Sequence, residues 1–238
     1  MKRQMVFQRY ELKFMLTQAQ QQHLLSVMAD RVEEDAFPHS SIRNLYLDTP
    51  DFRLIRRSLE RPVYKEKVRL RSYGQAGEGD TVFVELKKKY RSVVYKRRLA
   101  LPQGEAMACL SGTAPCPDSQ IGGEIAYTLD YYGNLAPAVF LSYERDSYRS
   151  LADDGLRLTF DRDIRFRREM LCLDTAPWGQ TLLTENQVLK EVKSPGALPL
   201  WLVEALSDME VRKTSFSKYG AAYQSLLRQE RKGAERYA

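Results

Sequence analysis

The segment Lys65-Glu66-Lys67-Val68-Arg69-Leu70-Arg71-Ser72-Tyr73 decides the fold class. A cation stands at every second position from Lys65 to Arg71, and apolar Val68 and Leu70 stand between them. In a β-strand, residues two positions apart lie on the same face of the sheet. The segment is therefore predicted to be a strand with one charged face and one apolar face.

Similar alternation recurs along the chain and favours an α+β fold with a mainly antiparallel sheet. We expect strands over residues 6–15, 41–48, 63–73, 81–99, 138–149, 156–166 and 187–194. Helical patterns cover residues 18–30, 51–59, 121–133, 198–207 and 217–231. No linker or internal repeat divides the chain, so we interpret residues 1–238 as a single domain.

The charge on the shared strand faces is strongly biased. The whole chain has 37 Lys and Arg against 31 Asp and Glu, a net charge of +6. By our count the predicted faces alone hold about thirteen cations and four acids. The cations are Arg9, Lys13, Lys65, Lys67, Arg69, Arg71, Lys87, Lys89, Lys96, Arg98, Arg145, Arg157 and Lys193; the acids are Glu11, Glu85, Asp161 and Glu191.

Two interpretations explain these faces. They are solvated outer faces of an antiparallel sheet, or they form a concave surface that binds a multivalent anion. Charges two residues apart repel by roughly 2–3 kcal/mol at an effective dielectric of 20, so only an open face tolerates them without a ligand. Arginine suits phosphate oxygens. A carboxylate beside a phosphate-binding cation, as in Glu11-x-Lys13, Glu85-x-Lys87 and Glu191-x-Lys193, suits Mg²⁺ or Mn²⁺.

An ordered set of motifs from residue 9 to residue 219 resembles the VTC domain, the polyphosphate polymerase domain of the triphosphate tunnel metalloenzyme superfamily, which has a CYTH-like fold. The opening motif is Arg9-x-Glu11-x-Lys13 where the superfamily has Glu-x-Glu-x-Lys, a departure that VTC-type domains share. The motifs cover residues 9–14, 41–49, 67–73, 82–87, 143–145, 156–161, 191–193 and 213–219.

The resemblance implies an antiparallel β tunnel barrel with helices packed outside and a cationic lumen. In such domains the triphosphate of ATP enters the tunnel, and Mn²⁺ or Mg²⁺ bridges phosphate oxygens. The terminal phosphoryl group passes to a polyphosphate chain, with positioning and charge neutralisation as the main sources of catalysis. ATP and polyphosphate or tripolyphosphate are the expected partners.

The resemblance also implies residue roles. Arg69, Arg71 and Lys218 are the expected catalytic residues. Glu191 is the expected metal ligand, and Glu11 and Glu85 either ligate the metal or orient the lysines. Ser217 and Lys218 open the last predicted helix, where backbone N–H groups favour anions. The expected phosphate-binding residues are Lys13, Lys67, Arg69, Arg71, Lys87, Lys96, Arg145, Arg157, Lys193, Ser217 and Lys218.

Other functions fit the same scaffold. One is a hydrolase of tripolyphosphate or nucleoside triphosphates, which differs in letting water reach the γ-phosphorus. Another is a non-catalytic module that binds polyphosphate or inositol phosphates. A nucleic-acid partner is not expected, because the sequence has no RNP-type aromatic motif and no recognition helix.

The remaining features indicate a cytoplasmic protein. No apolar run reaches the ~18 residues of a membrane span, and the N-terminus lacks the apolar core of a secretory signal. Cys109, Cys116 and Cys172 argue against a disulfide framework and a zinc cluster and fit a reducing cytoplasm. Without a membrane or channel partner, a polymeric product would be released there. We expect structural roles for His23 and for His39, in a loop. The basic run of Arg162, Arg165, Arg167 and Arg168 forms either a solvated rim, which we prefer, or an exit patch for a polyanionic product.

Overall fold

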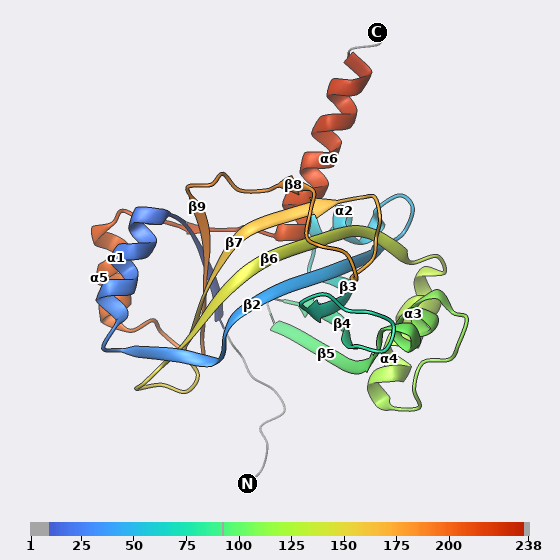
Figure 1. Cartoon of the computed structure of the whole chain (residues 1–238), viewed down its shortest axis with the longest axis horizontal. Coiled ribbons are helices and arrows are strands. Elements are labelled where there is room, and N and C mark those ends of the chain that lie inside the picture. Colours follow the sequence, from blue (N-terminus) through green and yellow to red (C-terminus); the bar gives the residue numbers. More distant parts are fainter. Residues whose placement is uncertain (1–9, 92, 236–238) are drawn as a thin grey trace. The chain divides into compact units, whose positions relative to one another are not determined.

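The computed structural model describes residues 10–91 and 93–235, which form ten strands and six helices (Figure 1). The strands are β1 (Tyr10–Thr17), β2 (Val32–Asp48), β3 (Tyr64–Tyr73), β4 (Thr81–Tyr90), β5 (Val93–Pro102), β6 (Ala136–Ser150), β7 (Arg157–Arg167), β8 (Gln180–Thr181), β9 (Gln187–Ser194) and β10 (Lys213–Thr214). The helices are α1 (Gln18–Met28), α2 (Arg53–Leu59), α3 (Gln103–Ser111), α4 (Gln120–Tyr132), α5 (Leu200–Asp208) and α6 (Lys218–Glu235).

The strands form one hydrogen-bonded sheet in the order β10-β1-β9-β7-β6-β2-β3-β4-β5, with β8 paired to β7. The ladders of β1, β7 and β9 and those that join β2 through β5 are antiparallel. Within the described residues, β10 and β5 are the two ends of the order, so hydrogen bonds do not close the sheet. The α+β class with an antiparallel sheet is confirmed.

The chain divides into two compact units, which share three strands. Unit 1 comprises residues 1–41, 143–164 and 183–216, and unit 2 comprises residues 42–142, 165–182 and 217–238. Strands β2, β6 and β7 contribute residues to both units. The interpretation of the chain as a single domain stays a prediction.

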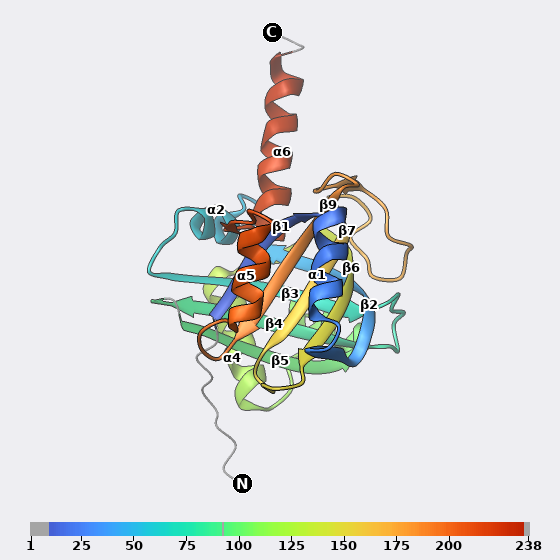
Figure 2. The ribbon, with the colours of Figure 1, turned by 90° about the vertical axis from the view of Figure 1, so that its left-hand side faces the viewer.

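In unit 1, helices α1 and α5 lie side by side over one face of the strands (Figure 2). That face carries alternate apolar residues, such as Phe14 and Leu16 of β1 and Leu158 and Phe160 of β7, which pack with Leu24 of α1. Burial of each such side chain contributes about 1.5–3 kcal/mol. The charged residues of these strands lie on the opposite face, because they occupy the intervening positions.

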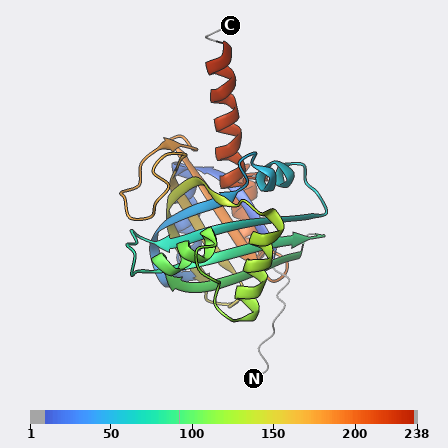
Figure 3. The ribbon, with the colours of Figure 1, turned by 90° about the vertical axis from the view of Figure 1, so that its right-hand side faces the viewer.

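In unit 2, helices α3 and α4 cover the apolar face of β3, β4 and β5 (Figure 3). Val68, Leu70, Val84 and Leu86 are buried there, and the charged positions of the same strands alternate with them. In both units, therefore, helices pack against the apolar face and the charged face is opposite.

Asp48 fixes the start of α2 in unit 2. Its Oδ1 accepts hydrogen bonds from the backbone N–H groups of Thr49 and Leu54, and its Oδ2 accepts from Ile55. The hydroxyl of Tyr219, in α6, donates to the same Oδ2 at 2.8 Å. Burial raises the pKa of Asp48, although the four hydrogen bonds act in the opposite direction. One carboxylate thus joins β2, α2 and α6.

Two sequence expectations are wrong in detail. Cys109 and Cys116 form a disulfide within unit 2, although the cysteine count argued against a disulfide framework. The bond joins α3 to the loop that follows it, and Cys109 is buried in the core. His39 lies in β2 rather than in a loop. No helix of the described residues has the length and apolar character that a bilayer crossing requires.

Candidate functional site

The register of β3, β4 and β5 aligns the charged residues of unit 2 in rows across the strands. Lys67 lies opposite Lys87, and Lys87 lies opposite Lys96. The next row places Glu85 between Arg69 and Arg98. Residues directly opposite each other in antiparallel strands have Cβ atoms about 4.5–5.5 Å apart. The strands therefore concentrate cations that are far apart in the sequence.

Glu85 is the centre of this cluster. Its side chain is 1% exposed and accepts hydrogen bonds from Arg69 Nε at 2.7 Å, Arg98 Nε at 2.7 Å and Lys96 Nζ at 2.8 Å. Arg71 Nε lies 3.8 Å from Oε2. One carboxylate thus neutralises one of four positive charges. Burial acts to raise the pKa of Glu85, but the charges of Arg69, Arg71 and Lys96 outweigh it and lower the pKa strongly.

The surplus charge affects other groups of the cluster. Desolvation lowers the pKa of Lys96 to about 8, although its ion pair with Glu85 acts in the opposite direction. An anion bound here would stabilise the protonated lysine. We call Arg69, Arg71, Glu85, Lys96 and Arg98 the Glu85 cluster.

Tyr46 of β2 holds Arg69 from a second side. It lies directly opposite Arg69 in the ladder, and its hydroxyl accepts a hydrogen bond from Arg69 Nη1 at 2.9 Å. Its ring stacks on Tyr219 with centroids 4.4 Å apart. Burial acts to raise the pKa of Tyr46, but Arg69, Lys67 and Arg71 outweigh it and lower the pKa to about 8.

Asn44 of β2 holds the side chain of Arg71 in place, as Tyr46 holds that of Arg69. Its Oδ1 accepts a hydrogen bond from Arg71 Nε at 2.9 Å, and its Nδ2 donates to the carbonyl of Leu141 at 3.1 Å. Asn44 and Tyr46 belong to the motif at residues 41–49, but no individual role is predicted for either residue from the sequence. Asn44 and Tyr46 are two residues apart and therefore share one strand face, and this spacing could have indicated that both belong to the site.

The start of α6 contributes Ser217 and Lys218. Lys67 Nζ donates to Ser217 Oγ at 3.0 Å, and the same oxygen accepts from the backbone N–H of Gly220 at 3.2 Å. Lys218 is the first residue of α6 and is buried. The structure thus brings together Lys67, Ser217 and the start of the helix, while Lys87 is half-buried in the row beside Lys67.

A second charged cluster lies on the polar face of unit 1. Lys13 Nζ lies 3.3 Å from Glu191 Oε1 and 3.2 Å from Glu11 Oε1, and it also donates to the carbonyl of Phe216 at 3.0 Å. The β1–β9 ladder explains the first contact, because it pairs Lys13 with Glu191. We call this group, with Arg145 and Asp161, the Glu191 cluster.

Arg145 completes the Glu191 cluster. Its Nη2 donates to Glu191 Oε2 at 3.1 Å, and its guanidinium also binds Asp161, whose side chain is fully buried. Burial acts to lower the pKa of Arg145, but Tyr143, Asp161 and Glu191 raise it. Arg145 therefore remains charged.

The other predicted phosphate-binding residues of unit 1 lie at the end of the same face. Lys193 is paired with Glu11 in one ladder and with Arg157 in the other. Arg157 is half-exposed and lies 3.6 Å from a carboxylate oxygen of Asp35. Arg9, which the opening motif includes, lies outside the described residues.

The predicted metal ligands Glu11, Glu191 and Glu85 lie in two different environments. Glu11 and Glu191 both converge on the ammonium of Lys13, and hard carboxylate oxygens suit Mg²⁺ or Mn²⁺. No group of three or more His, Cys, Asp or Glu suited to a metal occurs among residues 10–91 and 93–235. Mg²⁺ sites of one or two carboxylates plus substrate phosphates do not need a third. A divalent ion that a phosphate chain brings with it would bind Glu11 and Glu191 in place of their contacts with Lys13 and Arg145. Glu85 is instead surrounded by four cations.

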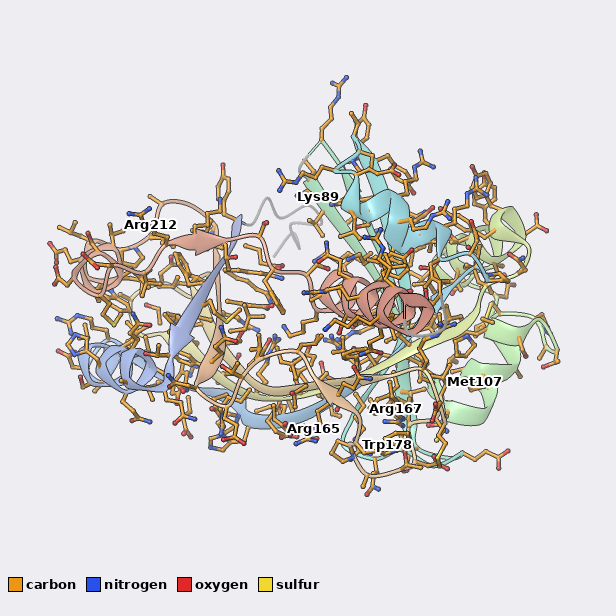
Figure 4. The ribbon with its side chains drawn as sticks, turned by 90° about the horizontal axis from the view of Figure 1, so that it is seen from above. Lys89, Met107, Arg165, Arg167, Trp178 and Arg212 are labelled. Atoms are coloured by element: carbon orange, nitrogen blue, oxygen red, sulfur yellow. A yellow bond between two sulfur atoms is a disulfide. The ribbon has the colours of Figure 1, made fainter. Side chains whose placement is uncertain are left out.

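The predicted solvated rim is wrong for Arg167, which is buried. Figure 4 shows Arg167 beside Trp178, and its guanidinium carbon lies 4.8 Å from that ring centroid. It donates to the carbonyls of Glu169, Met170 and Cys172. Arg167 thus fixes the loop between β7 and β8. Arg162 and Arg168 are exposed, as expected.

His39 has a specific partner in unit 1. Its Nδ1 lies 2.7 Å from Asp146 Oδ1, and Asp146 Oδ2 accepts from Arg162 Nη2 at 2.6 Å. His39 lacks a metal-binding group of three in the described part of the chain.

Solved structures of other proteins share the α+β fold of this chain. A solved structure from Bacillus halodurans, provisionally named an adenylate cyclase, is 15% identical, with a TM-score of 0.54 over 87% of this chain and 92% of that one. Another from Vibrio parahaemolyticus, with the same provisional name, is 11% identical, with a TM-score of 0.52 over 92% and 99%. At such low identity these likenesses show the fold alone.

The chain belongs to the VTC domain family, whose model matches residues 8–227. No curated protein matches the chain. The resemblance that the sequence motifs indicated is thereby confirmed.

Proposed function

We propose that this domain is an ATP-dependent polyphosphate polymerase. The observation that carries the proposal is the Glu85 cluster, in which four cations surround one buried carboxylate. A surplus of charge on half-buried strand positions is expected to attract a multivalent anion. Membership of the VTC family and the tunnel fold support a triphosphate or polyphosphate as that anion.

Phosphoryl transfer on this scaffold relies on position and charge. The terminal oxygen of a polyphosphate chain attacks the γ-phosphorus of ATP, the bond from that phosphorus to the β–γ bridging oxygen breaks, and ADP leaves. Arg69, Arg71 and Lys218 stabilise the charge on the transferred group. The remaining phosphate-binding residues proposed are Lys13, Lys67, Lys87, Lys96, Arg145, Arg157, Lys193 and Ser217.

Tyr46 and Asn44 keep the two arginines in place during transfer. Tyr46 accepts a hydrogen bond from Arg69 Nη1 and Asn44 accepts one from Arg71 Nε, so the planes of both guanidinium groups are fixed before phosphate binds. Glu191 and Glu11 would hold Mn²⁺ or Mg²⁺, which would supply further neutralisation of phosphate charge. We propose that the reaction takes place in the cytoplasm, where another protein would have to channel the product if it is not released.

The test is product analysis with purified chain, ATP and Mn²⁺. We expect polyphosphate and ADP, and loss of both with Arg69→Gln combined with Arg71→Gln. Arg228→Gln combined with Arg231→Gln is the matched control, because these arginines are exposed on α6. Circular dichroism establishes that each variant is folded, and Lys218→Ala is a second variant if the arginine pair is not.

Three results would contradict the proposal. Orthophosphate as the sole product would assign a hydrolase. Binding of tripolyphosphate without turnover in Mn²⁺ or Mg²⁺ would assign a binding module. Equal activity of the two double variants would remove the Glu85 cluster from catalysis.

A further inference from the structure

The polar face of β3, β4 and β5 changes composition from one end to the other. The β3–β4 ladder pairs Lys65 with Lys89 at one end and Arg71 with Phe83 at the other. Between them lie the lysine row of Lys67 and the arginine row of Arg69 described above. Tyr73 follows Arg71 on the same face and ends β3. The face therefore has a lysine end, an arginine centre and an aromatic end.

The aromatic end is held in place by contacts between its own side chains. Tyr73 is 49% exposed, and its ring meets that of Phe83 edge-on, with centroids 5.8 Å apart. Arg98 Nη2 donates to the Tyr73 hydroxyl at 3.1 Å, and its guanidinium carbon lies 4.5 Å from the Phe83 ring centroid. Arg98 also belongs to the Glu85 cluster, so the aromatic pair is attached directly to the cationic centre.

Such a surface suits a nucleobase. Bases stack on aromatic rings with little dependence on their identity, and arginine adds a cation–π contribution. The exposed part of Tyr73 has no role in the core, because the apolar face of β3 lies on the other side. Its hydroxyl bond to Arg98 holds the ring in one orientation.

The lysine end suits phosphates without a base. Lys65 and Lys89 are directly opposite, an arrangement of like charges that destabilises a sheet. No carboxylate of the described residues lies within ion-pair distance of Lys89, which Figure 4 labels on β4, or of Lys65. Burial and then the charges of Lys89, Arg61 and Lys87 lower the pKa of Lys65. A polyanion would relieve this repulsion.

We propose that the nucleobase of the donor nucleotide stacks at Tyr73 and Phe83, and that the phosphate chain extends from there past Arg69 toward Lys65 and Lys89. The inference rests on the proposed function, since it orients the substrate of the same site. Four residues of strand, about 14 Å, separate Tyr73 from Arg69, a span comparable to an extended nucleoside triphosphate. The lysine end then takes the growing chain.

The test compares ATP, tripolyphosphate and long-chain polyphosphate by calorimetric binding at one salt concentration. We expect Tyr73→Ala to weaken ATP about tenfold and to leave tripolyphosphate unchanged, because only ATP has a base. Tyr73→Phe keeps the ring and should bind ATP nearly as the parent does. Tyr127→Ala, at an exposed tyrosine of α4, is the matched control.

The lysine end has its own readout in the same assay. Lys65→Ala combined with Lys89→Ala should weaken the binding of long-chain polyphosphate several-fold while ATP binding changes little.

If Tyr73→Ala does not fold, Tyr73→Leu replaces it in the test of the aromatic end.

Each result that would contradict the proposal concerns a different part of it. Equal loss of ATP and tripolyphosphate in Tyr73→Ala, or no loss of either, would overturn the nucleobase site. A larger effect of the lysine variants on ATP than on long-chain polyphosphate would overturn the direction. Failure of the parent chain to bind tripolyphosphate at all would instead contradict the proposed function.

Discussion

Arg145 donates two parallel hydrogen bonds to Asp161, from Nε to Oδ1 at 2.6 Å and from Nη2 to Oδ2 at 2.7 Å. Asp161 is fully buried and Arg145 is 12% exposed, so this pair is largely removed from water. The bidentate geometry fixes the plane of the guanidinium, and Nη2 also reaches Glu191. Asp161 therefore determines where Arg145 points within the Glu191 cluster.

Asp161→Asn should lower the free energy of unfolding by about 3 kcal/mol, because the buried Arg145 loses its bidentate partner and keeps only the single contact with Glu191. Urea denaturation at pH 7 measures the change. Asp35→Asn is the control, since Asp35 pairs with the half-exposed Arg157 and should cost less than about 1 kcal/mol. Equal losses in the two variants would show that burial of the Arg145 pair has no special importance.

Glu85→Gln should destabilise the chain and make its stability depend on phosphate. The variant leaves Arg69, Arg71, Lys96 and Arg98 without their shared carboxylate. We expect a lower melting temperature that tripolyphosphate raises more in the variant than in the parent. Glu124→Gln, which loses ion pairs with Lys88 and Arg97, is the control. A tripolyphosphate effect of the same size in both variants would contradict the assignment.

Lys190→Met should stabilise unit 1. Lys190 is fully buried on the apolar face, and its Nζ lies 4.0 Å from the ring centroid of Phe160 with no hydrogen-bond partner among the described residues. Desolvation lowers the pKa of Lys190 well below its usual value. The unfolded chain then binds more protons than the folded chain between the folded pKa and the ordinary value of 10.5.

The stability of the parent should accordingly rise with pH through that interval, because the cost of the buried amine disappears once the unfolded lysine is also neutral. The advantage of Lys190→Met should shrink as the pH approaches 10.5. Chemical denaturation at a series of pH values checks this, and a constant difference between the two proteins would contradict it.

Tyr46→Phe should remove a tyrosine titration near pH 8. The folded pKa is below the ordinary value of 10, so the folded chain releases its proton first. Ionisation of Tyr46 therefore adds stability between about pH 8 and 10, and this contribution is lost as the pH falls through 8. Ultraviolet difference titration measures the step. Tyr132→Phe, which loses a hydrogen bond to Glu66, is the control and should retain it.

Gly179→Ala should destabilise the β7–β8 ladder by about 1–3 kcal/mol. Gly179 has φ +126°, and an added Cβ would lie 2.3 Å from the carbonyl oxygen of Phe166. Gly123→Ala in α4 is the opposite case, since its Cβ would meet nothing within 4 Å and alanine favours a helix. Thermal unfolding distinguishes the two, and a neutral Gly179→Ala would contradict the steric argument.

The sequence predicted the charged strands well, because their period of two is set by the backbone itself. The strand expected at 63–73 is Tyr64–Tyr73, and the last helix starts one residue from its expected position. The strand expected at 81–99 is instead two strands, since the chain turns at Arg91 with φ 44° and no glycine or asparagine marks the turn. The part of the first strand at residues 6–9 lies outside the described residues.

Other elements lacked a readable signal. Helix α3 follows Pro102 and contains Gly104, which hides its pattern, and its Cys109 forms the disulfide with Cys116. The first half of β2 includes several acids and Pro38, so no alternation indicates a strand. The pairing register of the strands could not be predicted from the sequence either. Only the ladders reveal that Glu85 faces Arg69 and Arg98 at once, or that Tyr46 faces Arg69.

The bond between Asp48 and Tyr219 joins residues 171 positions apart in the chain. At a synthesis rate of about 5–20 residues per second, roughly 10–30 s pass on the ribosome between the two. During that interval Asp48 and Tyr46 lack the ring and hydroxyl of Tyr219, and Lys67 lacks Ser217. Unit 2 therefore completes its contacts only when the last helix emerges, so the cations of β3 leave the ribosome well before the residues at the start of α6 that contact them.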